Sequence, residues 1–540
     1  MKVDRCYYGP PGTGKTTTLM KDIKQFLNDG YNLSDITYET FRRTMAEDFK
    51  RRLVEDLGLE NKGMTFISTT HSIAYRLLAS EHGWNTKNNV ALPWRHYVQF
   101  CKENHIPITR DDVEIDVEEG VIKTPDEYET FGAKVYIIYC NCINTLTPFD
   151  KWYELPSYMR PNFTEPISDL YSVIVDIIEK WIKWQEENNR YDFAMMLKLC
   201  LEEKLTPNTS IYMSDETHDK TPIQVELSKL WARDADYVYY AFDIMQTIYS
   251  FWGTDPSFCY EVWKKAKEKV VLTPSYRLSY EIYNTARLIL KKSGQNAPDI
   301  ECKGEGVVRI IKPNKFLDLV KILDKVAILA RTTYHLKVIA NELAREGIIY
   351  TGIGGWGGRM LSVYKVVYNY RNGLPIERSD FIKFVEAYPA EFFITTKERI
   401  KKIAPYELQP EDVDKYITYS FRKLIKESEK PFDSILNSYI SADAKMKMNV
   451  ALAKNAKPIP KAILCTIHGS KGLEWDNVIL FDGITRKITI SIETYESEFK
   501  NECRVWYVGM TRAKKCLFII PSSFFSSGLS RSFIGGVLRC

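Results

Sequence analysis

Short apolar runs alternate along the chain with longer stretches of helical periodicity. Residues 3–8 predict a strand, and residues 17–26 predict a helix whose apolar side chains recur on one face. Residues 210–214 predict a second short strand, and residues 167–184 have apolar positions at helical spacing. The pattern is typical of an α/β chain with a helical region inserted between its strands.

Composition narrows the class of protein only slightly. The 540 residues leave room for about three or four domains of ordinary size. The net charge is +4, so no general basic field indicates a nucleic-acid ligand. The eleven cysteines show no paired CxxC spacing, which favours reduced thiols over a zinc site. Because no apolar run approaches the roughly 18 residues of a membrane span, and no secretory signal fits the N-terminus, we expect a soluble cytoplasmic protein without a membrane partner.

A phosphate loop lies between the first predicted strand and the helix. Residues 9–16, GPPGTGKT, match GxxxxGK[ST] at every fixed position. The glycines allow backbone N–H groups to surround phosphate oxygens, and the helix N-terminus adds partial positive charge. We expect Lys15 to reach the β- and γ-phosphates of ATP and Thr16 to offer its hydroxyl to Mg²⁺. The predicted nucleotide-binding residues of this loop are Gly9, Pro10, Pro11, Gly12, Thr13, Gly14, Lys15, Thr16 and Thr17.

An acidic pair follows the second predicted strand. Asp215 is expected to hold Mg²⁺, and Glu216 to polarise the attacking water as general base. About 200 residues separate this pair from the phosphate loop. That distance predicts an accessory region inserted in the nucleotide-binding domain. The loop and the pair alone are equally compatible with ring-forming ATPases, kinases and helicases.

Six further segments resemble the superfamily 1 UvrD/Rep helicases, in the order of that family. They are THSIA at 70–74, DIMQTIYSFWG at 243–253, PSYRLS at 274–279, ILAR at 328–331, TIHGSKGLEW at 466–475 and ECRVWYVGMTRA at 502–513. The match spans nearly the whole chain, and the last two segments are long and specific. The resemblance implies an α/β fold of two RecA-like P-loop parallel-sheet domains, each with a mainly helical insert.

The domain boundaries follow from this resemblance. The first RecA-like domain is expected at residues 1–80 plus 190–270, with a helical insert at 81–189. The second is expected at 271–355 plus 460–540, with its insert at 356–459. The second insert holds 18 Lys/Arg and 13 Asp/Glu, a net charge of +5, which suits duplex contact but is also usual for a solvated face.

The resemblance also implies the rest of the nucleotide site. Gln246 is expected to sense the γ-phosphate, Tyr276 to stack on adenine and Glu474 to hold the ribose. Arg277 and Arg512 are expected to contact the γ-phosphate from the second domain, so that hydrolysis requires the two domains to close. The predicted catalytic residues are Lys15, Glu216, Gln246, Arg277 and Arg512.

A nucleic-acid strand is expected to lie along other parts of the same segments. Stacking on aromatic rings tolerates any base sequence, as a motor on arbitrary DNA requires. The expected contacts are Phe41, for which Thr37-Tyr38 is the alternative alignment, together with His71, Phe251, Trp252, His468 and Lys471.

The sequence also departs from the family pattern at several positions. His218 stands where the family has glutamine, and Trp252 where it has arginine. The family's adenine-reading glutamine has no counterpart before residue 9, which leaves nucleotide selectivity open.

The predicted function is an ATP- and Mg²⁺-dependent helicase or translocase on single-stranded DNA and single-strand/duplex junctions. Its 3′→5′ polarity is carried over from the family. The alternatives are a strand translocase that strips proteins with little unwinding, and an ATP-gated nucleic-acid clamp. RNA stays open as a substrate because stacking and phosphate contacts serve both polymers.

Overall fold

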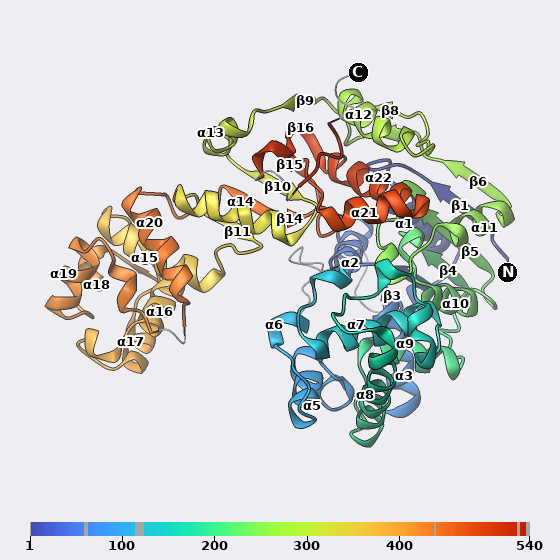
Figure 1. Ribbon diagram of the computed structural model, residues 1–540, viewed down its shortest axis with the longest axis horizontal. Coiled ribbons are helices and arrows are strands. Elements are labelled where there is room, and N and C mark those ends of the chain that lie inside the picture. Colours follow the sequence, from blue (N-terminus) through green and yellow to red (C-terminus); the bar gives the residue numbers. More distant parts are fainter. Residues whose placement is uncertain (1, 59–62, 114–123, 437–438, 526–529, 536–540) are drawn as a thin grey trace.

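The computed structural model describes residues 2–58, 63–113, 124–436, 439–525 and 530–535. It contains two six-stranded sheets whose strands are all parallel (Figure 1). The strand orders are β3-β2-β4-β5-β1-β6 and β11-β14-β10-β15-β16-β9. The predicted fold class, an α/β chain with two parallel-sheet units, is confirmed.

The first sheet draws its strands from two distant parts of the chain. They are β1 (Arg5–Tyr8), β2 (Ile36–Thr40), β3 (Ile67–Thr69), β4 (Ile211–Ser214), β5 (Tyr237–Phe242) and β6 (Glu268–Val271). Four helices accompany them: α1 (Lys15–Asn28), α2 (Arg43–Leu57), α10 (Pro222–Trp231) and α11 (Ser257–Lys265). The strand and helix predicted at residues 3–8 and 17–26 are β1 and α1, each bound lying within two residues of its prediction.

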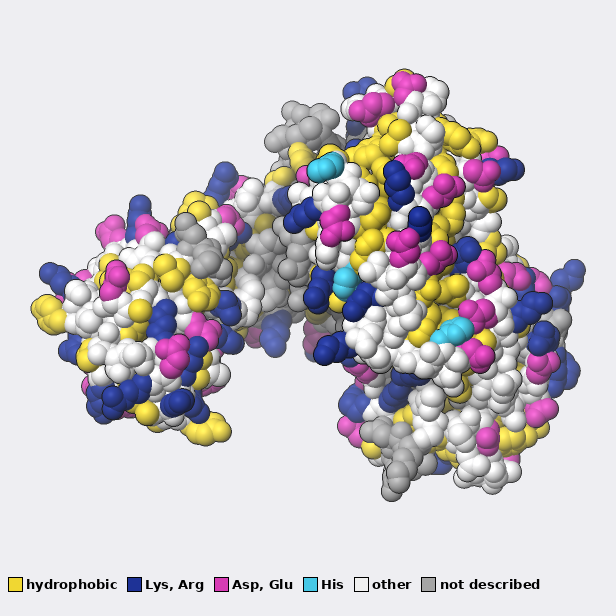
Figure 2. All heavy atoms as spheres, turned by 90° about the horizontal axis from the view of Figure 1, so that it is seen from below, with side chains coloured by type: hydrophobic (Ala, Val, Ile, Leu, Met, Phe, Trp, Pro, Cys, Tyr) yellow, Lys and Arg dark blue, Asp and Glu magenta, His cyan; other side chains and the backbone are white. Residues whose placement is uncertain are grey.

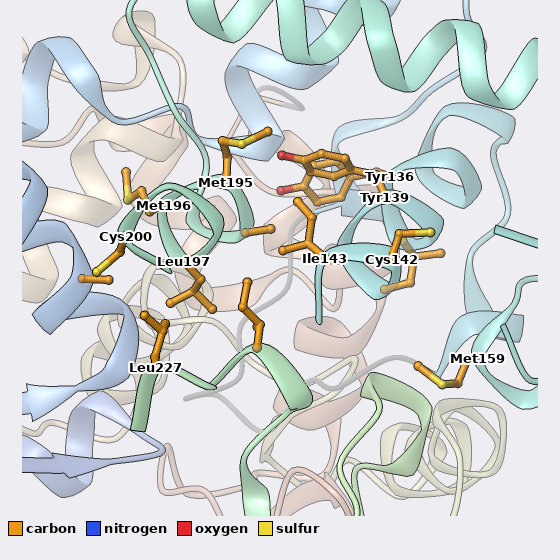
Figure 3. Close-up of a cluster of buried hydrophobic side chains, with 14 of the residues drawn as sticks. Tyr136, Tyr139, Cys142, Ile143, Met159, Met195, Met196, Leu197, Cys200 and Leu227 are labelled. Carbon is orange, nitrogen blue, oxygen red and sulfur yellow. The ribbon is translucent and has the colours of Figure 1, made fainter. Parts of the chain in front are cut away.

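In the described residues between β3 and β4, seven α-helices are found. They are α3 (Thr70–His82), α4 (Thr86–Asn89), α5 (Val98–Glu103), α6 (Arg110–Val113), α7 (Phe131–Thr145), α8 (Ile167–Glu187) and α9 (Phe193–Glu202). Figure 3 shows Tyr139 and Ile143 of α7 in one buried cluster with Met195 and Met196 of α9 and Leu227 of α10. This cluster continues into β4 and β5, so the inserted helices and the first sheet share a single core. Residues 114–123 of the predicted insert lie outside the described part of the chain.

The second sheet consists of β9 (Val307–Ile310), β10 (Val326–Ala330), β11 (Tyr350–Gly352), β14 (Ala462–Thr466), β15 (Trp475–Phe481) and β16 (Ala513–Ile520). Its helices are α12 (Tyr280–Lys291), α13 (Phe316–Ile322), α14 (Thr333–Arg345), α21 (Arg486–Thr494) and α22 (Glu496–Met510). A two-stranded parallel pair, β7 (Pro274–Ser275) with β8 (Glu301–Cys302), lies in the segment that connects β6 of the first sheet to β9 of the second.

A second group of helices lies between β11 and β14 and projects as a lobe from the second sheet unit, with which it shares one buried hydrophobic cluster (Figure 1). It comprises α15 (Gly358–Arg371), α16 (Arg378–Ala387), α17 (Lys397–Ile403), α18 (Pro410–Val413), α19 (Tyr419–Glu427) and α20 (Ala442–Ala453), with the pair β12 (Ile376–Glu377) and β13 (Glu407–Leu408). Figure 2 shows this lobe at the left, with basic and acidic side chains interspersed over its visible face. None of the described helices is long and apolar enough to cross a membrane.

Candidate functional site

The phosphate loop connects β1 to α1 at the carboxyl end of the first sheet. Gly12 has a φ of +76°, and a Cβ added there would lie 2.5 Å from the Cβ of Arg277. Glycine at this position therefore allows both the left-handed turn and the close approach of the segment that carries Arg277. The buried Lys15 ammonium donates to the carbonyl of Gly9 at 2.8 Å, so it lies over its own loop.

The acidic pair follows β4 and meets the loop directly. The Thr16 hydroxyl donates to Asp215 Oδ2 at 2.6 Å, and the Tyr38 hydroxyl donates to the same oxygen at 3.0 Å. Burial and the neighbouring Glu216 raise the pKa of Asp215 to about 6. A carboxylate and a hydroxyl in contact, with excess negative potential, form the oxygen donor set that Mg²⁺ prefers. Thr16 and Asp215 therefore fit the predicted magnesium site.

A cavity of about 550 Å³ opens over the loop, and both sheet units line it. From the first unit it receives Lys15, Glu216 and Gln246, and from the second Arg277 and Arg512. The Arg277 guanidinium pairs with Glu474, which also lines the cavity. Tyr276 lies at the cavity with 73% of its surface exposed, available for a flat ligand. The structure thus brings most of the predicted nucleotide residues around one space, whereas Gly9, Pro10 and Thr13 of the loop do not line it.

Arg512 joins the two units at the back of this cavity. It is 1% exposed, and its Nη2 donates to Gln246 Oε1 at 3.0 Å. It also donates to the carbonyls of Val508 and Leu473 and to the hydroxyl of Thr511. Burial, with Arg277 nearby, lowers the pKa of Arg512 to about 9. Arg277 is paired with Glu474, whereas no ion pair of Arg512 is found among the described residues, so a phosphate in the cavity would supply the negative charge that Arg512 lacks.

Lys471 was expected along a nucleic-acid strand, but the structure places it elsewhere. Its buried ammonium donates to Asp219 Oδ1 at 2.5 Å and to the carbonyl of Gln246, and lies 3.0 Å from His218 Nε2. It lines the nucleotide cavity. The prediction of a strand contact by Lys471 is not met in this arrangement because the acidic pocket of the first unit encloses the ammonium.

The predicted stacking residues gather between the two units. Tyr249 stacks on Phe41 and Trp252, with ring centroids 5.0 and 5.1 Å apart. Phe251 and His468 are 5% and 2% exposed and meet edge to face at 5.3 Å. In this arrangement neither ring offers a free face to a base, because Phe251 lies in a cluster that joins the two units and His468 packs against Tyr249 and Phe251.

His71 lies apart from this ring cluster. It is half-buried at the start of α3, with its ring 6.3 Å from Phe193. Burial lowers its pKa to about 4, so the imidazole is neutral at physiological pH and brings no charge for a phosphate.

A second cavity, of about 380 Å³, is lined in part by Phe251, which does not line the nucleotide cavity. The first insert contributes Tyr158, and the second unit contributes Arg331, Lys487 and Tyr495. The Nε–H of Arg331 donates to both carboxylate oxygens of Glu502, at 2.9 and 3.0 Å. Sequence reasoning missed these side chains because three segments far apart in the chain contribute them, and only Arg331 belongs to a recognised motif.

A phosphate loop on one parallel sheet, faced by arginines from a second parallel sheet, defines a two-domain P-loop NTPase. Residues 7–267 match the UvrD/Rep helicase N-terminal domain, and residues 389–523 match the UvrD-like helicase C-terminal domain. The two matches together cover more than half of the chain, and the chain belongs to the UvrD/Rep family of helicases.

Several relatives align with almost the whole chain. YjcD of Bacillus subtilis is 22% identical over 94% of this chain and 75% of its own length. The ATP-dependent DNA helicase Rep of Buchnera aphidicola is 22% identical over 94% of this chain and 89% of its own. The ATP-dependent DNA helicase UvrD2 of Mycobacterium tuberculosis is 22% identical over 94% and 75%. The resemblance predicted from the sequence motifs is confirmed.

Proposed function

We propose that this helicase hydrolyses ATP with Mg²⁺, moves 3′→5′ along single-stranded DNA and unwinds the duplex ahead of it. The nucleotide cavity carries the proposal, because each sheet unit supplies only part of its lining. A triphosphate bound on the loop attracts Arg277 and Arg512 of the second unit and so favours closure. Hydrolysis removes that attraction, and the two units can separate.

The roles within the cavity follow from charge and reach. Lys15 and the loop amides bind the β- and γ-phosphates, and Thr16 and Asp215 hold Mg²⁺. Glu216 orients and deprotonates the attacking water. Gln246 accepts a hydrogen bond from Arg512 at 3.0 Å in the nucleotide cavity. Phe251 of the ring cluster follows five residues later in the same segment, so Gln246 connects the two sites. The bound cation supplies charge neutralisation at the phosphates.

The strand is proposed to pass through the second cavity, along Phe251 and Trp252. Rings from both units and the cations Arg331 and Lys487 surround this space, a combination suited to bases and phosphates of a single strand. Phe251 and His468 are packed on each other here, so a base that stacks on either one must separate the two units locally. DNA binding and closure are thereby coupled.

The moving bodies are proposed to be the two RecA-like domains with the boundaries expected from the sequence. The first insert shares a core with the first sheet and moves with it. The second insert, residues 356–459, shares a buried cluster with the second sheet and projects from it as a lobe (Figure 1), and we propose that this lobe contacts duplex.

The test is strand displacement with duplexes carrying a 3′ or a 5′ single-stranded tail. We expect ATP-dependent unwinding of the 3′-tailed duplex alone, loss of activity in Glu216→Gln, and stronger stimulation of hydrolysis by DNA than by RNA of the same length. Unwinding from the 5′ tail would refute the polarity. DNA-stimulated hydrolysis without unwinding would favour a strand translocase over a helicase. Absence of hydrolysis would favour an ATP-gated clamp.

A further inference from the structure

His218 has a position in the nucleotide site that the roles above do not use. It lies at the end of the acidic segment, 0% exposed, between Glu216 of its own unit and Lys471 of the other. Its Nε2 is 3.2 Å from Glu216 Oε2 and 3.0 Å from Lys471 Nζ. One ring nitrogen therefore faces both the proposed general base and a cation delivered by the second sheet.

The hydrogen bond at the other ring nitrogen fixes the tautomer. The backbone N–H of Asp243 donates to His218 Nδ1 at 3.1 Å. A backbone N–H can only donate, so Nδ1 must accept and the proton of the neutral ring lies on Nε2. Burial and the charge of Lys471 lower the pKa of His218 well below its usual value, which keeps the ring neutral. The Nε2–H is then a donor directed at Glu216.

Lys471 completes this arrangement from the second unit. Glu216, His218 and Asp219 place their ligand atoms within 4.8 Å of one another, a spacing that would also suit a metal ion. The Lys471 ammonium is already in this cluster, donating to Asp219 at 2.5 Å and to the carbonyl of Gln246. The protein thus provides its own cation here, and it does so only while the two units are together.

We propose that His218 is a positioning residue that holds the Glu216 carboxylate by its Nε2–H and makes that orientation depend on Lys471 of the second unit. The proposal rests on the role of Glu216 as general base. The ammonium of Lys471 cannot donate to a protonated Nε2, so it acts through its charge, which attracts the Glu216 carboxylate toward His218. When the units separate, Lys471 leaves and this attraction is lost. Hydrolysis therefore requires the closed state for two reasons: the arginines of the second unit reach the phosphate only there, and the general base Glu216 is oriented only there.

Two near-isosteric substitutions separate this role from simple packing. The side-chain amide N–H₂ of His218→Gln reaches the position of ring Nε2 and restores a donor to Glu216. The amide of His218→Asn reaches only the position of Nδ1, where its oxygen can still accept from Asp243. Both remove the ring, and asparagine also removes one methylene, so the thermal stability of each variant is compared to separate loss of packing from loss of the donor.

The measurement is steady-state ATP hydrolysis with saturating single-stranded DNA. We expect the kcat of His218→Gln to stay within about threefold of the unmodified protein. The kcat of His218→Asn should fall about 10–100-fold, as when an orienting partner of a catalytic group is removed, with little change in KM for ATP. Equal kcat values for the two variants, or a loss confined to KM, would overturn the inference.

Glu216→Gln is measured beside them to separate the two levels of the proposal. Full activity in Glu216→Gln would show that the general-base assignment fails. Loss of activity in Glu216→Gln with equal activity of the two His218 variants would show that only the positioning role fails. Thermal melting of each variant confirms that the compared proteins are folded.

Discussion

Replacing Arg512 by lysine tests whether the two sheets must meet around the nucleotide. The guanidinium is buried and bonded to Gln246 Oε1, Val508 O and Leu473 O. Among the described residues, no carboxylate lies within salt-bridge distance of it. Lysine keeps one positive charge at this place but loses the planar fork that binds Gln246 and a phosphate together.

The expected magnitude follows from the proposed role. Loss of an arginine that stabilises the transferring phosphoryl group lowers kcat by about 10³–10⁵-fold. At 1.36 kcal/mol per factor of ten, that corresponds to about 4–7 kcal/mol of transition-state stabilisation. Binding of ATP relies mainly on the loop, so its Kd should change less than about tenfold. A net hydrogen bond is worth about 1 kcal/mol, so Arg512→Lys should fold.

The assay is DNA-stimulated ATP hydrolysis, with nucleotide affinity measured separately by calorimetry. Arg345→Lys is the matched control, because Arg345 lies on the same unit, is exposed and, within the described part of the chain, pairs with Glu342 alone. Hydrolysis by Arg512→Lys within about tenfold of the unmodified protein would refute the reasoning. So would a loss of rate explained entirely by weaker ATP binding.

Three further predictions concern stability, pH and metal. Lys220→Met leaves the buried Glu39 without its cation and should lower the free energy of unfolding by about 3–5 kcal/mol. Adding Glu39→Gln to Lys220→Met should restore most of this loss. Urea unfolding measures both proteins, and equal stability of the single and the double variant contradicts the pairing. Burial and Glu502 raise the pKa of Glu498 to about 7, so the wall of the second cavity gains negative charge as pH rises from 6 to 8. Single-strand affinity measured by fluorescence anisotropy should therefore fall over this range, less so in Glu498→Gln, and a rising affinity contradicts it. Because the pKa of Asp215 is about 6, Mg²⁺ binding at pH 6 should release protons from this carboxyl group. Calorimetry should then give a binding enthalpy that depends on the buffer. This dependence should vanish at pH 8 and in Asp215→Asn.

The local elements were predictable because local residues determine them. The short run at residues 3–8 and the glycines at 12 and 14 specify a strand, a left-handed turn and a helix start within twenty residues. The motif resemblance then supplied the second sheet, which no short-range pattern could have placed. The same resemblance named the side chains that surround the nucleotide cavity.

Burial at the interface between the units was not predictable in this way. Lys471, Phe251 and His468 each belong to a motif, and their motif position suggested exposure toward a strand. Their neighbours, such as Asp219 for Lys471, come from segments about 200 or more residues distant. Whether such a side chain is exposed depends on how two domains pack, and a single sequence contains no periodic signal for that contact.

The position of β1 in its sheet has a consequence for biosynthesis. This strand pairs on one side with β5, where Arg5 is opposite Tyr239, and on the other with β6, where Arg5 is opposite Glu268. A ribosome adding about 5–20 residues per second needs about 10–50 s to make these partners after β1 has been translated. During that time the apolar Cys6 and Tyr7 have no sheet to enter, and they are open to chaperones or to misfolding. The phosphate loop is thus among the first segments of its domain to be translated and among the last to acquire its shape.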